Sequence, residues 1–307
     1  MNMTHFPSSL AFLLAFSALV LADDKPKGPL LKLVREAKCE KVFPSPGPFD
    51  ASGLTLAKGE LYLVFDTRKA IGVVSPDLKS GRLSEAPAGI SDYEGISYDP
   101  ERGCFYVVVE ALRTPQGYKG GLIELDASLK PKAQWILDPP IGGPSKGFEG
   151  VLALRRAGRE YVLVMLESNH GAAKADPKAD DLGNGRLRVY ERKEAEGAVT
   201  WALVTTIHLP SEAKFEDYAG LSLRGRRLAV VSQSTRRLWI GTLDPKRWAI
   251  EGKGQVYRFP KTGGRYGNLE GVAWLSDEQL AFVSDGARGK AKNLAKAESV
   301  HVFELPE

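Results

Sequence analysis

Histidine and cysteine, the side chains that most transition-metal sites use, are scarce in this chain. It holds four histidines and two cysteines among 307 residues, and they do not stand at the spacings of zinc-ligand pairs. The chain also lacks the Walker A phosphate loop and the H-E-x-x-H motif. A zinc centre, a P-loop nucleotide site and a zincin-type protease are therefore not expected.

Long apolar runs are lacking after the N-terminus. Residues 10–21 form one such run, which ends in Val20-Leu21-Ala22 and is followed by Asp23 and Asp24. The run is too short for a membrane helix and is typical of a secretory signal peptide. We therefore predict a signal peptide over residues 1–22, a single domain over residues 23–307, and a secreted or periplasmic protein. No later run approaches the roughly 20 apolar residues of a membrane span.

A strong excess of charge is lacking too. The formal net charge is +4, and the basic residues are spread along the chain. A scattered excess of this size is usual for a solvated surface and does not make the basic stripe of a nucleic-acid-binding protein. We expect a monomer without a nucleic-acid partner.

What the chain does contain is a short phrase, Glu-Gly after an aromatic or apolar residue, that it repeats. Two of the five copies keep the glycine and replace the glutamate. The copies are Ser52-Gly53, Glu94-Gly95, Glu149-Gly150, Ala219-Gly220 and Glu270-Gly271. They recur roughly every 40 to 70 residues, a spacing at which repeats indicate propellers and other arrays.

Each copy opens a unit of short β-type runs. The second run of each unit is apolar on both faces, as a strand between two neighbouring sheets must be; these runs are residues 61–65, 105–109, 161–165, 228–231 and 280–283. Third and fourth runs follow, and the last unit has only three. We predict an all-β propeller with five four-stranded blades, closed by an N-terminal strand within residues 30–43. Six blades are the alternative, if the long third unit contains another.

The two cysteines fall on blades that this arrangement keeps apart. Cys39 lies in the closing N-terminal run, and Cys104 begins the second run of the second unit. Export permits a disulfide, but we expect two separate thiols.

The ends of the second runs carry a further pattern. An acid, or glutamine once, is followed two or three residues later by Arg or His. In a propeller the start of the first strand and the end of the second meet at one face of the disc. That face should carry an inner ring of acids, namely Glu94, Glu149, Glu270, Asp66, Glu110, Glu167 and Asp285. Around it we expect a basic collar of Arg68, Arg113, His170, Arg236 and Arg288.

Several carboxylates around one axis need a counter-charge, because close like charges raise one another's pKa. A hard cation or the collar arginines can supply it, and oxygen-only ligands favour Ca²⁺, with Mg²⁺ as the alternative. The competing interpretation is structural: each glutamate accepts backbone N–H groups from the next blade, and the acid–Arg pairs are salt bridges between blades.

The repeated D-[YLF]-E-G-[ILV] openings, with strands ending in V-[SV]-[DE], resemble the phytase-like propellers. These include the group described as "esterase-like activity of phytase" and the SdiA-regulated propellers. The resemblance begins near Phe49 and implies a calcium-dependent attack of water on a phosphate ester. It implies metal-side roles for Glu94, Glu149, Glu270, Glu110, Glu167 and Asp285, and phosphate-side roles for Arg68, Arg113, Arg236 and Arg288.

Two functions follow as hypotheses. The first is a metal-dependent ester hydrolase acting on a small-molecule phosphate ester or carboxylic ester. Its catalytic candidates are Glu149, Glu167 and His170, the one histidine placed at the presumed site. The second is a non-catalytic exported propeller that binds a ligand or a protein at the same face. Propellers host many unrelated functions, so the fold does not choose between them.

Overall fold

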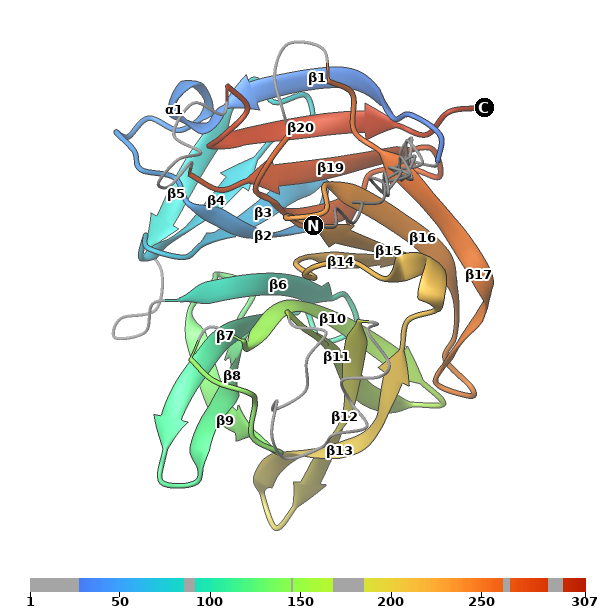
Figure 1. The fold of residues 1–307 in the computed structure, drawn as a ribbon. Coiled ribbons are helices and arrows are strands. Elements are labelled where there is room, and N and C mark those ends of the chain that lie inside the picture. The colour runs from blue at the N-terminus through green and yellow to red at the C-terminus, as the bar shows by residue number, and fades with distance from the viewer. Residues whose placement is uncertain (1–27, 86–91, 145, 168–184, 262–265, 287–294) are drawn as a thin grey trace, which may run out of the picture.

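The computed structural model describes residues 28–85, 92–144, 146–167, 185–261, 266–286 and 295–307. The predicted signal peptide lies outside these ranges. The described strands form five four-stranded antiparallel sheets around one axis (Figure 1). The predicted five-bladed propeller is therefore confirmed.

In each blade the strand that contains or directly follows the Glu-Gly phrase, or its altered copy, lies next to the channel. From the channel outward, the first three blades are β2 (Ala51–Ala57), β3 (Glu60–Phe65), β4 (Ala70–Val74) and β5 (Gly81–Glu85); β6 (Tyr93–Asp99), β7 (Cys104–Thr114), β8 (Gly117–Leu125) and β9 (Pro131–Leu137); and β10 (Phe148–Arg156), β11 (Arg159–Leu166), β12 (Arg186–Ala195) and β13 (Ala198–His208). The other two are β14 (Leu221–Arg224), β15 (Arg227–Ser232), β16 (Arg237–Asp244) and β17 (Ala249–Arg258); and β18 (Leu269–Trp274), β19 (Gln279–Ser284), β20 (Ser299–Glu304) and β1 (Lys32–Lys38).

The fifth blade joins the two ends of the chain. Strand β1 pairs antiparallel with β20, from Lys32 opposite Glu304 to Lys38 opposite Ser299. The strand is shorter than the predicted run of residues 30–43, because the chain turns at Cys39 into a one-turn helix, α1 (Cys39–Val42), whose Cys39 and Val42 side chains are buried. The N-terminal strand supplies the outer strand of the fifth blade. Without it, β20 would be an open edge.

The second strands are buried on both faces because a neighbouring blade covers each face. In β3, Tyr62 and Val64 pack into one cluster with Phe105 and Val107 of β7, while Leu61 and Leu63 face the cluster of the fifth blade. Each such side chain stabilises the fold by roughly 1.5–3 kcal/mol through burial. The continuous apolar runs of the sequence thus correspond to strands between two blades.

Five glycines bring the inner strands close together at mid-channel. We name Gly53, Gly95, Gly150, Gly220 and Gly271 the glycine collar. A Cβ atom on Gly95 would lie 2.7 Å from the Cα of Gly150, and one on Gly220 would lie 2.3 Å from the carbonyl oxygen of Glu270. Only glycine permits this approach. The void at the collar is about 10 Å³, close to the space that one water molecule needs.

The two cysteines lie in different parts of the ring. Cys39 belongs to the apolar cluster between the fifth and first blades, and Cys104 to the cluster between the second and third blades. Both are buried free thiols. Burial raises the pKa of Cys39 to about 12, which keeps this thiol protonated and unreactive at neutral pH.

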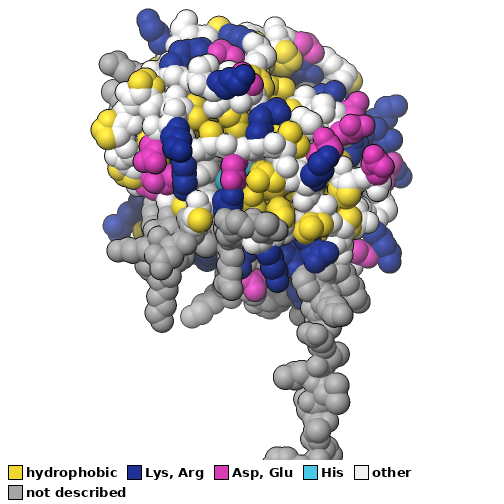
Figure 2. Space-filling model, turned by 90° about the horizontal axis from the view of Figure 1, so that it is seen from above, with side chains coloured by type: hydrophobic (Ala, Val, Ile, Leu, Met, Phe, Trp, Pro, Cys, Tyr) yellow, Lys and Arg dark blue, Asp and Glu magenta, His cyan; other side chains and the backbone are white. Residues whose placement is uncertain are grey.

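The outer edge of the fifth blade mixes charges of both signs with apolar side chains (Figure 2). No described helix has the length and apolar character that crossing a membrane requires.

Candidate functional site

The glutamates of the repeated phrase occupy β-bulges. The pairing of first and second strand shifts register between Tyr93 and Gly95, between Phe148 and Gly150, and between Leu269 and Gly271. The first blade has the same shift around Ser52. A bulge leaves one residue unpaired and changes the direction of its side chain. The extra residue in these three blades is Glu94, Glu149 or Glu270.

The ends of the second strands lie beside these bulges. The backbone N–H of Asp66 donates to the carbonyl of Asp50 at 2.9 Å, and that of Asp285 donates to Asn268 at 2.9 Å. Equivalent bonds join Glu110 to Asp92 and Glu167 to Gly147. In each of these four blades one backbone hydrogen bond continues the pairing of the first and second strands past its last paired residues. It holds the acid at the end of the second strand at the same end of the channel as the Glu-Gly phrase.

Together these residues line a cavity of about 350 Å³ at one mouth of the channel. We name it the acidic cavity. Its lining residues are Ser52, Asp66, Glu94, Glu110, Glu149, Glu167, Gln233, Asn268, Glu270 and Asp285. All seven acids that the sequence placed in the inner ring are among them.

Two groups of three carboxylates are tight enough to share an ion. Asp66, Asp92 and Glu94 offer oxygens that all lie within 4.8 Å of one another, as do those of the second group, Glu110, Glu149 and Glu167. Asp92 was not among the predicted ligands. It precedes the phrase glutamate by two residues and has a φ of 76°, a backbone conformation that Asp adopts more readily than most residues.

Burial and mutual repulsion raise the pKa values of the cavity acids. Burial is the larger cause for Glu94, Glu149 and Glu270, whose pKa values stand well above the usual range, and neighbouring carboxylates add to it. The pKa of Glu110 rises to about 7 through burial and the charges of Asp92 and Glu167. The cavity therefore favours bound protons or a bound cation over a full set of bare carboxylates.

The fourth blade contributes amide and hydroxyl chemistry in place of acids. Gln233 Nε2 donates to Glu270 Oε1 at 2.6 Å, and the Ser52 side chain is also hydrogen-bonded to Glu270, which lowers its pKa somewhat. Glu270 thus has neutral partners. The replacements at Ser52 and Gln233 make the cavity lopsided, with both three-carboxylate groups on the first three blades.

The three described arginines of the predicted basic collar do not line this cavity. The Arg68 guanidinium lies 4.4 Å from the Phe49 ring centre and donates to Ser45 Oγ at 3.1 Å and to the Pro46 carbonyl. Arg113 is exposed on the β7–β8 hairpin, which continues beyond Glu110 to Thr114, and Arg236 is exposed in the turn before β16. None of the three lines the cavity. His170 and Arg288 lie outside the described residues.

A basic residue that the sequence pattern did not single out does reach the acidic cavity. Lys146 Nζ lies 3.0 Å from Glu167 Oε2, and its side chain is 54% exposed. It precedes the third Glu-Gly copy by three residues, a position outside the acid-then-Arg pattern.

Two serines deserve comparison with hydrolase nucleophiles. Residues 143–147 read G-x-S-x-G, but strand β10 follows rather than the helix of a nucleophile elbow; Ser145 itself lies outside the described residues. Ser284 Oγ lies 3.1 Å from His301 Nε2, and His301 Nδ1 lies 3.3 Å from Glu36 Oε2. Ser284 and His301 are both 0% exposed. This Ser–His–Glu arrangement is therefore inaccessible to a substrate and ties β1 to β20 and β19.

Comparisons with known proteins support the fold. No family model and no curated protein matches the chain. Among solved structures, glutaminyl cyclase from Myxococcus xanthus is similar, with a TM-score of 0.53 and 12% identity over 91% of this chain and 98% of that one. The PQQ-bound aldose sugar dehydrogenase from Streptomyces coelicolor has a TM-score of 0.51 and 14% identity over the same shares. At these identities the likeness shows the architecture alone.

Proposed function

We propose that the acidic cavity binds a hard divalent cation, Ca²⁺ with Mg²⁺ as the alternative, and that the protein is a metal-dependent hydrolase of phosphate or carboxylic esters. The observation that carries the proposal is the pair of three-carboxylate groups, of which every member except Asp92 lines the acidic cavity. The lining offers oxygen ligands only, which suits hard cations and not zinc or copper. The resemblance of the repeated phrase to phytase-like propellers supports the same function.

The residues divide into roles by position. Asp66, Asp92 and Glu94 would hold one cation, and Glu149 with Glu167 would hold a second beside them. Glu110, whose carboxylate lies beside those of Glu149 and Glu167, would accept the proton of the attacking water. A bound cation would supply a lowered water pKa and offset charge that develops on the ester oxygens.

The substrate side of the site rests on fewer residues than the sequence pattern suggested. Among the described residues, Lys146 beside Glu167 provides a positively charged side chain that can contact an anionic ester group. His170 and Arg288 stay candidates for acid–base and phosphate contacts. Arg68, Arg113 and Arg236 leave this proposal, because they do not line the cavity.

A second function, a non-catalytic exported propeller that binds a ligand or a protein, is favoured by one observation. Arg68 is held by Ser45, Pro46 and the Phe49 ring, contacts that fix a loop and leave its guanidinium away from the cavity. In that case the cation would stabilise the ring without activating water.

Two measurements separate these functions. Titration calorimetry with Ca²⁺ and Mg²⁺ should show binding to the wild type and a loss of about tenfold or more in Glu149→Gln, since a charged ligand is removed. The control is Glu278→Gln, an exposed acid in the β18–β19 turn. Hydrolysis of p-nitrophenyl phosphate and p-nitrophenyl acetate is then followed with Ca²⁺ and with chelator. Cation binding without turnover would select the non-catalytic function, and absence of cation binding would remove both metal roles.

A further inference from the structure

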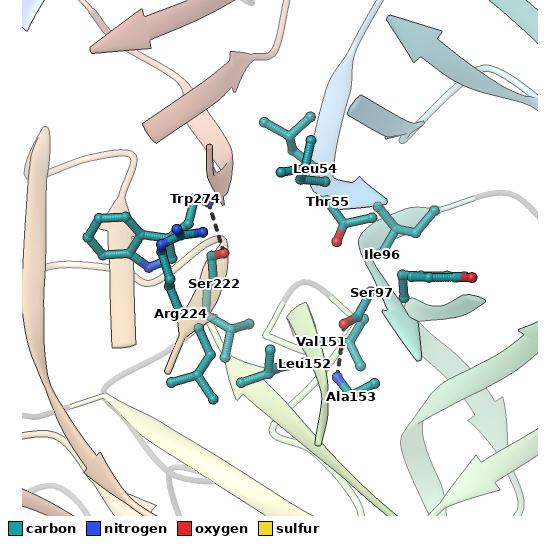
Figure 3. Close-up of a pocket in the computed structure, with 14 residues that line it drawn as sticks. Leu54, Thr55, Ile96, Ser97, Val151, Leu152, Ala153, Ser222, Arg224 and Trp274 are labelled. Carbon is teal, nitrogen blue, oxygen red and sulfur yellow. Dashed lines mark hydrogen bonds between the residues drawn. The ribbon is translucent and has the colours of Figure 1, made fainter. Parts of the chain in front are cut away.

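A second cavity, of about 250 Å³, lies at the opposite mouth of the channel (Figure 3). Its lining residues follow the collar glycines by one to four positions in the inner strands, whereas Glu94, Glu149 and Glu270 of the acidic cavity precede them by one. The glycine collar, with a void of about 10 Å³, separates the two cavities. A ligand larger than water at one mouth therefore cannot pass to the other.

Four side chains with a hydroxyl group line this second cavity, those of Thr55, Ser97, Tyr98 and Ser222. Thr55, Ser97 and Ser222 each stand two residues after a collar glycine. Ser97 Oγ accepts the backbone N–H of Ala153 at 2.9 Å, and Ser222 Oγ accepts that of Trp274 at 3.2 Å; both bonds are drawn in Figure 3. Because each oxygen accepts a bond from the next blade, its own O–H can donate to a ligand. The mouth thus presents hydrogen-bond donors.

One cation stands at the rim. Arg224 Nε donates to Asp277 Oδ1 at 2.6 Å, and the side chain is 41% exposed. The guanidinium has a second edge with terminal N–H groups, which suits a second oxyanion. Among the described residues that line this cavity there is no Asp or Glu. The two mouths therefore differ in the charge of ligand that they favour.

Apolar side chains form the floor of the cavity. Leu54, Ile96 and Val151 are almost fully buried and lie at the floor, next to the collar. At about 30 Å³ for each water, the cavity has space for roughly eight waters. A ligand of about ten non-hydrogen atoms, polar at one end and apolar at the other, matches this space. A single guanidinium with neutral hydroxyl donors matches one negative charge better than two.

We propose that this second cavity is a binding site for a small organic monocarboxylate, with the carboxylate on Arg224 and the hydroxyls of Thr55, Ser97 and Ser222 and the apolar body against Leu54 and Val151. The site stands apart from the ester hydrolase proposed above, because different residues on the far side of the collar form it.

Hexanoate is a suitable probe for titration calorimetry on the full chain, with acetate, hexan-1-ol, hexylammonium and inorganic phosphate as comparisons. Hexanoate should bind more tightly than all four. Arg224→Gln should weaken its binding about tenfold or more, because a charge-assisted contact is lost. Thr55→Val, which keeps the side-chain shape, should weaken it about threefold.

Matched variants separate this site from general charge effects and from the acidic cavity. Arg226→Gln removes an arginine that pairs with Glu251 Oε2 at 2.6 Å and does not line the cavity, so hexanoate affinity should not change. Glu149→Gln should leave it unchanged as well, even if that variant loses cation binding. Unfolding temperatures of Arg224→Gln and Thr55→Val verify that both are folded.

Three results would overturn the proposal. They are no hexanoate binding at millimolar concentration, equal loss in Arg224→Gln and Arg226→Gln, or tighter binding of hexylammonium or phosphate than of hexanoate. Equal affinity for acetate and hexanoate would contradict the apolar part of the assignment.

Discussion

At the scale of single residues, the phrase glutamates reach the channel because each stands at a bulge. Sequence showed the repeat and its acids, and the antiparallel order of the first two strands was enough to place all seven acids at one mouth. The bulge itself was not predicted, since a register shift depends on the pairing partner, which a single strand's sequence does not specify. Arg68, Arg113 and Arg236 were misplaced for a related reason: contacts in a loop or hairpin, which the strand pattern does not specify, decide the direction of these side chains.

Glu149→Gln should stabilise the protein in the presence of a chelator at pH 8. Glutamine removes a carboxylate whose ionisation is opposed by burial and by Glu94 and Glu167. The gain in unfolding free energy should exceed roughly 0.5 kcal/mol, the range within which most surface substitutions change stability. Urea denaturation measures it, with Glu278→Gln as the control. A destabilised Glu149→Gln would mean that the cavity tolerates this charge without help.

Gly95→Ala tests the collar. Its Cβ would lie 2.7 Å from the Cα of Gly150 and 2.8 Å from the backbone nitrogen of Val151, so the inner strands must separate. We expect a loss of about 1–3 kcal/mol in unfolding free energy, the usual cost of overpacking. Gly143→Ala, where nothing lies within 4 Å of the new atom, should be close to neutral. Equal effects of the two substitutions would contradict a close-packed collar.

At the scale of elements, side-chain contacts as well as backbone hydrogen bonds attach β1 to its blade. Glu36 on β1 contacts His301 Nδ1 at 3.3 Å and forms an ion pair with Lys296. The hydrogen bond with His301 and the charge of Lys296 lower the pKa of Glu36 to about 2. The sequence predicted the closing strand from a count of runs. It could not predict this cluster, because His301 meets Glu36 only after the two chain ends pair.

Glu36→Gln should lower the unfolding free energy by about 1–2 kcal/mol at pH 7. Hydrogen bonds to charged groups contribute more than this when buried, but the Glu36 side chain is 33% exposed and solvent screens it. Glu40→Gln, an exposed acid in α1, is the control and should change little.

The same substitution should alter the acid limb of stability. The folded pKa of Glu36, about 2, lies below the ordinary value of 4.5. Its contribution is therefore present above about pH 4.5 and is lost as the pH falls through about 2. The free energy of unfolding of the wild type should fall more steeply than that of Glu36→Gln in this window. Parallel curves would show that the pair contributes nothing.

At the scale of the whole molecule, the acidic cavity should make stability depend on pH and on cations together. Its glutamates have folded pKa values above the unfolded ones. Their ionisation therefore opposes folding as the pH rises above about 4.5, and the cost of Glu110 is complete above about pH 7. In the presence of a chelator, the melting temperature should rise as the pH is lowered from 8 to 5.

Added Ca²⁺ should reverse that trend. At pH 8 a bound cation adds about 2.7 kcal/mol of stability when present at a hundred times its Kd. At pH 5 the same concentration should add much less, because protons occupy the carboxylates. Scanning calorimetry at both pH values, with and without Ca²⁺, measures the difference. A melting temperature that Ca²⁺ leaves unchanged at pH 8 would exclude a tight cation site.

The pairing of β1 with β20 also has a consequence for the order in which the chain is made. Lys32 and Glu304, which face each other across this pair, are 272 residues apart. Synthesis from the N-terminus therefore produces one of the first strands of the ring long before its partner exists. Until β20 emerges, β1 has no ladder to join and the first blade lacks a neighbour on one side. The emergence of β20 thus decides when the whole ring can become a closed, cooperative unit.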